Sequence, residues 1–167
     1  MSVAIAVAAL VLSLSAFLHG RWRDRRDLFL QIYKHLVSAD QQRGRRLLHS
    51  MGEKQAQVKD LSEDDYVLIN NALASLNVLA FYYQRRYVRR KDVLELWALP
   101  VRRALLAGDA FLEHRDALQE LPIWPELRAF DKDAGKYLQR IGVIIQKPTL
   151  KPGIPQPAEK QSPPQQP

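Results

Sequence analysis

The chain has 167 residues and a formal net charge of +7, and it contains no cysteine. The absence of cysteine excludes disulfides, thiolate nucleophiles and zinc sites with Cys ligands. The length allows one domain with short appendages, and the positive charge suits a surface that faces an acidic partner such as nucleic acid or anionic lipid.

The chain opens on an apolar segment, because residues 2–20 contain no Asp, Glu, Lys or Arg. As a helix this segment would measure about 28 Å, close to the ~30 Å hydrocarbon core of a bilayer. We therefore predict a transmembrane helix over residues 1–20. Two other interpretations stay open: a secretory signal that is cleaved near Ala16, although no basic residue precedes the apolar run, and a helix buried in a protein core.

Basic residues directly follow the apolar segment and predict its orientation. No basic side chain precedes the segment, so the positive-inside rule places the N-terminus outside the plasma (inner) membrane and the rest of the chain in the cytoplasm. An aromatic residue among these arginines suits the membrane interface. We call this group the first basic cluster and expect it to fix topology or to contact anionic lipid head groups; it comprises Arg21, Trp22, Arg23, Arg25 and Arg26.

Small residues recur at four-residue spacing in the apolar segment. Ala4 and Ala8 form one such pair, and Ala9 and Ser13 form another. Spacings of this kind let two membrane helices approach closely. A homodimer through this segment is therefore an open alternative.

Apolar residues recur at helical spacing from Arg21 to about Gln146. The fold class that this pattern predicts is all-α, with a cytoplasmic bundle of four to six helices over residues 21–146. Its first helix of about 17 residues can be continuous with the apolar segment. A second helix starts at Asp40 and ends near Gly52, because glycine is common at helix C-termini.

Three further helix starts can be read from the sequence. Ser62 with Asp65 has the pattern of a capping box, so a helix begins there. Asp92 is expected to cap the next helix, and Pro100 should end or kink it because proline lacks an N–H and crowds the preceding turn. Pro125 suits the first position of the last helix.

The end of the chain is rich in proline. Residues 147–167 hold seven of the ten prolines, with Gln, Ser and Lys between them. Such a composition cannot build a core, so this tail is predicted to be disordered.

No local pattern of residues predicts a catalytic or metal site. The four histidines form no HxxxH or HExxH pair. Asp131 and Asp133 resemble the start of a calcium loop, but its twelfth position is Gly142 rather than Glu. There is also no glycine-rich phosphate loop. We predict a protein that is not an enzyme and uses no cofactor or metal; an enzyme with an unrecognised site is kept as an alternative.

A second basic cluster lies in the middle of the chain: Arg85, Arg86, Tyr87, Arg89, Arg90 and Lys91. Arginines near an anionic leaflet attract its lipids, so this cluster is a candidate interaction patch. Its other interpretations are a solvated helix end and a nucleic-acid site in which Tyr87 stacks on a base.

Three short motifs resemble an uncharacterised family of bacterial, membrane-anchored helical proteins, which is known only as a domain of unknown function. The motifs are Tyr87-Val88, the helix Val93–Trp97, and Trp124-Pro125. The resemblance implies a bacterial origin, an apolar N-terminal span and a helical cytoplasmic domain, and it carries no site residue.

Together these features predict a membrane-tethered helical module that interacts with a protein or with lipid on the cytoplasmic face. Trp97 and Trp124 are expected to anchor the core. The alternative functions are a membrane-associated nucleic-acid binder that uses the second basic cluster, and the enzyme noted above.

Overall fold

The computed structural model describes residues 2–54 and 57–145, without the side chains at 2–6, 8 and 18. The predicted proline-rich tail lies outside these residues. The described chain is entirely helical, which confirms the all-α class. Its elements are α1 (Ser2–Leu36), α2 (Ala39–Lys54), the short 3₁₀ helix η1 (Val58–Asp60), α3 (Glu63–Gln84), α4 (Arg90–Ala107), α5 (Asp109–Gln119) and α6 (Pro125–Arg140).

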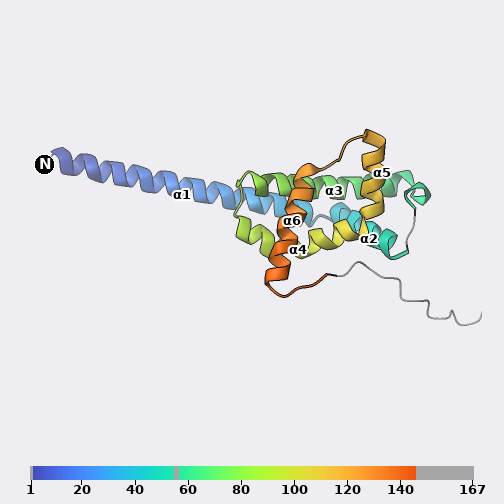
Figure 1. The fold of residues 1–167 in the computed structure, drawn as a ribbon. Coiled ribbons are helices and arrows are strands. Elements are labelled where there is room, and N and C mark those ends of the chain that lie inside the picture. The colour runs from blue at the N-terminus through green and yellow to red at the C-terminus, as the bar shows by residue number, and fades with distance from the viewer. Residues whose placement is uncertain (1, 55–56, 146–167) are drawn as a thin grey trace, which may run out of the picture.

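Helix α1 is one uninterrupted helix that extends far beyond the rest of the molecule, with the N-terminus at its distant end (Figure 1). Its C-terminal part packs on the bundle, where Leu36 is fully buried and Ile32 is partly buried. Its N-terminal part stands free, and Leu10 and Leu12 are 69% and 71% exposed. Within the described residues, no helix combines the length and the apolar character needed to cross a membrane.

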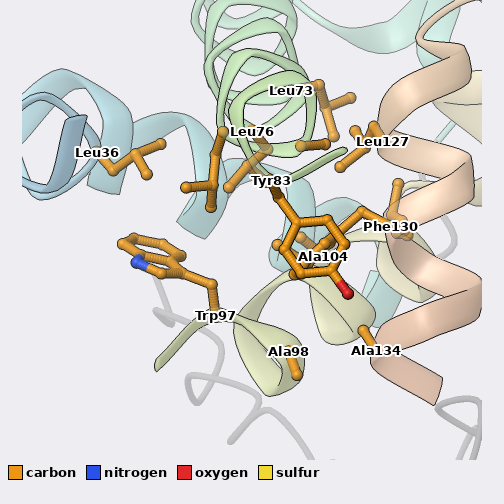
Figure 2. Packing of buried hydrophobic residues seen from close by; sticks show 14 of the residues in the cluster. Leu36, Leu73, Leu76, Tyr83, Trp97, Ala98, Ala104, Leu127, Phe130 and Ala134 are labelled. Carbon is orange, nitrogen blue, oxygen red and sulfur yellow. The ribbon is translucent and has the colours of Figure 1, made fainter. Parts of the chain in front are cut away.

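Four helices form the body of the bundle. Helix α3 packs against α2 and α6, and α4 packs against the same two helices from the other side. Figure 2 shows α1, α3, α4 and α6 contributing to one core. Trp97 is buried in it as predicted, while Trp124 is partly buried at its edge. Each large apolar side chain that is buried in this way contributes about 1.5–3 kcal/mol to folding.

Glycines let α2 lie unusually close to its neighbours. A Cβ at Gly44 would clash with the carbonyl oxygen of Leu68 on α3, and one at Gly52 would lie 2.7 Å from the carbonyl oxygen of Ala107 on α4. The helix end predicted near Gly52 falls two residues later, since α2 continues to Lys54. Gly52 is a packing position instead.

Pro100 does not end a helix, because α4 runs through it from Arg90 to Ala107. The N-cap expected at Asp92 is also wrong, because the N-cap of α4 is Arg89, three residues earlier. At position 100 any residue other than proline would donate its N–H to the carbonyl of Leu96. Leu96 is 51% exposed, so water reaches this side of the helix. Buried residues on both sides of the proline hold the helix together by packing into the same core: Val93, Trp97, Val101 and Ala104.

The other two predicted helix starts are confirmed. Ser62 is the N-cap of α3, and its Oγ accepts a hydrogen bond from the backbone N–H of Asp65 at 3.2 Å. Pro125 occupies the first position of α6.

Candidate functional site

A groove of about 340 Å³ lies between α1 and the start of α4. Its α1 side consists of residues spaced three or four apart, which places them on one face of the helix. Its other side comes from the turn before α4 and from the first turn of that helix. The groove therefore joins the two basic clusters, and it is lined by Trp22, Arg25, Arg26, Phe29, Leu30, Arg89 and Asp92.

Positive charge dominates this groove. Among the residues that the structure describes, Arg25 and Arg26 have no ion-pair partner. Arg89 lies 3.9 Å from Asp92, measured from Nε to Oδ2, and their side chains are 60% and 38% exposed. An exposed pair at this distance is weak, so Arg89 remains able to bind an anion. Three guanidinium groups thus face one carboxylate.

Apolar side chains complete the groove. Trp22 is 52% exposed and Leu30 is 42% exposed. Phe29 is partly buried, packs against the core and lines the groove. The groove is therefore amphiphilic, with arginines beside an aromatic and aliphatic surface.

The turn between α3 and α4 positions Arg89. The backbone N–H of Tyr87 donates to the carbonyl of Tyr82 at 3.0 Å, and that of Arg86 donates to the carbonyl of Tyr83 at 3.2 Å. This is the Schellman arrangement that ends a helix, with Arg86 at φ 58° in the position usually taken by glycine. The rings of Tyr87 and Tyr82 pack with centroids 5.7 Å apart.

Two further features tie this turn to the groove. Val88 is only 2% exposed and anchors the turn in the core. Arg89 is the N-cap residue of α4, and no side chain caps the first N–H groups of that helix. The positive end of the α4 dipole therefore adds to the charge of the arginines beside it.

Arg90 does not belong to the groove. Its Nη2 donates to Asp133 Oδ2 at 2.7 Å and to Tyr83 Oη at 3.0 Å, and its guanidinium lies 4.3 Å from the centroid of the Tyr83 ring. Burial raises the pKa of Tyr83, and the hydrogen bond from Arg90 acts in the opposite direction. Arg90 is a structural link between α3, α4 and α6.

The remaining members of the two clusters point elsewhere. Arg85 lies over the ring of Phe81, and Lys91 forms an exposed ion pair with Glu95 at 3.7 Å. Arg86 and Tyr87 are exposed at the turn between α3 and α4. Arg21 and Arg23 are exposed on α1. The structure thus brings together only part of each predicted set: Trp22, Arg25 and Arg26 from the first cluster and Arg89 from the second.

The two aspartates that resemble a calcium loop have a structural role. Asp131 pairs with Arg102 on α4, and Asp133 holds Arg90. Burial raises the pKa of Asp131, while the charge of Arg102 and its hydrogen bond lower it. No group of three or more acidic or histidine side chains in the described ranges is placed to hold a metal ion.

Sequence reasoning missed Phe29, Leu30 and Asp92 as parts of the site. The i, i+3, i+4 spacing from Trp22 to Leu30 indicates that these residues share one face of a helix. The sequence does not indicate that this face lies against the start of α4.

Comparison of the chain with protein-family models, with curated proteins and with solved structures gives no match. The resemblance to an uncharacterised bacterial family therefore stays a prediction, and the function must be inferred from the residues themselves.

Proposed function

We propose that this protein is a membrane-tethered helical module. Residues 1–20 anchor it in the plasma (inner) membrane with the N-terminus outside, and the bundle lies in the cytoplasm against the membrane surface. There its basic surface meets anionic head groups and presents the bundle to a protein partner. The role is one of interaction and localisation rather than catalysis.

The observation that carries this proposal is the exposure of apolar side chains along the free part of α1. Leu10, Val11 and Leu12 are 69%, 59% and 71% exposed. Consecutive residues point about 100° apart on a helix, so these three exposed apolar neighbours span more than half of its circumference. Such a helix needs an apolar environment that the bundle does not supply.

The register of the basic residues agrees with this arrangement. If residues 2–20 lie in hydrocarbon, Trp22 falls at the interface, and Arg25 and Arg26 fall among the head groups. Over its described residues α1 does not reach the apolarity of a span. What supports the proposal is the absence of charged residues from positions 2–20 of the sequence, together with the exposure of apolar side chains on the free part of the helix.

Alkaline carbonate extraction of membranes from cells that express the full chain tests the anchor. We expect the unmodified protein to stay in the pellet and Leu12→Arg to appear in the supernatant, because an arginine at a helix centre opposes insertion by about 2.5–3.5 kcal/mol. Leu118→Arg is the matched control, since Leu118 is 63% exposed on α5. An unmodified chain that is extracted by carbonate contradicts the proposal.

Cysteine labelling tests the orientation, and the chain has no native cysteine to interfere. A cysteine at Ser2 should react with a membrane-impermeant thiol reagent in intact cells, and one at Ser162 should react only after lysis. The reverse pattern would place the bundle on the outer side.

A further inference from the structure

We propose that the groove between α1 and α4 binds the head group of one anionic glycerophospholipid. Arg25, Arg26 and Arg89 contact its phosphate, and Trp22 lies beside its glycerol backbone. Phe29 and Leu30 form the floor under the polar head. This inference rests on the proposed function, because it requires the groove to lie at the surface of a bilayer.

The charges of the groove match a phosphate group. Guanidinium groups form bidentate, charge-assisted hydrogen bonds with phosphate oxygens. Arg25 and Arg26 are without an ion-pair partner within the described chain, and Arg89 has only a distant contact with Asp92. Their positive charges exceed the single negative charge of that carboxylate by two. An anionic phospholipid with one negative charge lowers this excess from two to one.

The height of the groove also matches a phospholipid head. Arg25 and Arg26 lie about 7.5 Å and about 9 Å beyond Gly20 along the helix axis at the ~1.5 Å rise per residue. The head-group layer on each side of a bilayer is about 5–7.5 Å thick. With Gly20 at the edge of the hydrocarbon, the backbone of these two arginines lies at the outer edge of the head-group layer, so their long side chains can extend back to the phosphates while Trp22 lies nearer the acyl chains.

The turn before α4 makes this a built site rather than a diffuse patch of charge. Arg89 follows the buried Val88 and precedes α4, so its backbone position relative to α1 is fixed by the core. Phe29 is held by the same core from the α1 side. A lipid can therefore contact arginines from both helices at once without ordering a loop.

Native mass spectrometry of the full chain in mild detergent tests the proposal. The probes are palmitoyl-oleoyl phosphatidylglycerol, which is anionic, and palmitoyl-oleoyl phosphatidylcholine, which is zwitterionic. We expect one phosphatidylglycerol per chain to be retained with at least about tenfold preference, since each arginine near an anionic lipid favours binding several-fold. The variant R25Q/R26Q/R89Q should lose that preference.

The matched control removes the same charge elsewhere. Arg43, Arg46 and Arg103 are exposed and lie outside the groove. R43Q/R46Q/R103Q should therefore keep the tenfold preference. Equal losses in the two triple variants would mean that the lipid responds to overall charge, and this would overturn the proposal.

Two other results would also overturn it. One is an unmodified chain that shows no preference between the two lipids. The other is a DNA oligonucleotide that displaces phosphatidylglycerol and loses its own binding in R25Q/R26Q/R89Q, which would make the groove a nucleic-acid site. Carbonate extraction separates the two proposals, because a chain that stays in the pellet without lipid preference keeps its anchor and loses only this inference.

Discussion

Asn77, in the middle of α3, accepts through its Oδ1 a hydrogen bond from the backbone N–H of Leu127 at 3.0 Å. Leu127 belongs to the first turn of α6, whose N-cap residue Trp124 has φ 54° and provides no side-chain cap. An N-terminal turn leaves several N–H groups without partners, and a cap normally comes from the preceding residue. Here a neighbouring helix supplies it.

We expect Asn77→Ala to lower the free energy of unfolding by about 1–2 kcal/mol, because it leaves that N–H without its acceptor. Asn71→Ala is the matched control, since Asn71 is exposed on the same helix. Urea denaturation of the full chain in detergent, followed by circular dichroism, measures both. Equal effects of the two substitutions would show that the bond contributes nothing.

Gly44→Ala should destabilise the bundle strongly. The new Cβ would clash with the carbonyl oxygen of Leu68 and would lie 2.9 Å from Cβ of Ala72, so α2 and α3 must separate. Overpacking of this kind costs about 1–3 kcal/mol. Gly135→Ala in α6 is the control; its Cβ meets nothing within 4 Å, and helix propensity favours alanine by up to about 1 kcal/mol. Thermal unfolding should therefore move in opposite directions for the two variants.

Arg86→Gly should raise the stability of the protein. Arg86 has φ 58°, a conformation that costs a residue with a side chain about 1–2 kcal/mol, and glycine removes part of that cost. Arg85→Gly makes the same charge change at a right-handed residue with φ −75° and should destabilise the helix end. Urea midpoints compare the two variants, and a lower midpoint for Arg86→Gly than for the unmodified chain would refute the expectation.

His49 should make stability depend on pH below 6.5. Burial lowers its pKa from the ordinary value of 6.5; Glu53 opposes this shift, and Arg103 and Arg45 reinforce it. The unfolded chain therefore binds a proton at a higher pH than the folded chain does. The stability that comes from a neutral His49 is complete above pH 6.5 and is lost as the pH falls toward the lower folded value.

Replacement of this histidine by glutamine tests that linkage. The difference in unfolding free energy between His49→Gln and the unmodified chain should change between pH 7.5 and pH 5. Because Asp131 and all other titrating groups are common to both proteins, the comparison isolates His49. A difference that is the same at both pH values would contradict the prediction.

The helices were largely predictable because each leaves a local signal. The apolar spacing around Leu36, Leu73 and Leu127 predicts helices, and all three side chains are fully buried. Ser62 and Pro125 mark two helix starts correctly. Pro100 does not end the helix, the first of the two outcomes predicted for it, because residues on both sides of the proline pack into the same core and this packing energy cannot be read from the local sequence.

The groove was predictable only in part. Arginine density singled out Arg25, Arg26 and Arg89, but their meeting depends on how the turn after α3 faces α1. That turn has Arg86 where glycine is usual, so it gives no sequence signal. The spacing on α1 could have added Phe29 and Leu30, whereas the capture of Arg90 by Asp133 on α6 could not have been read from either segment.

Because α1 is one unbroken helix from Ser2 to Leu36, it fixes the rotation and the distance of the bundle relative to the N-terminal part of the helix. Each residue added or removed between Arg21 and Asp27 turns everything after it by about 100° and shifts it by about 1.5 Å. A single deletion would therefore swing the bundle to another side of the axis, and about seven added residues would restore nearly the original heading at a greater distance.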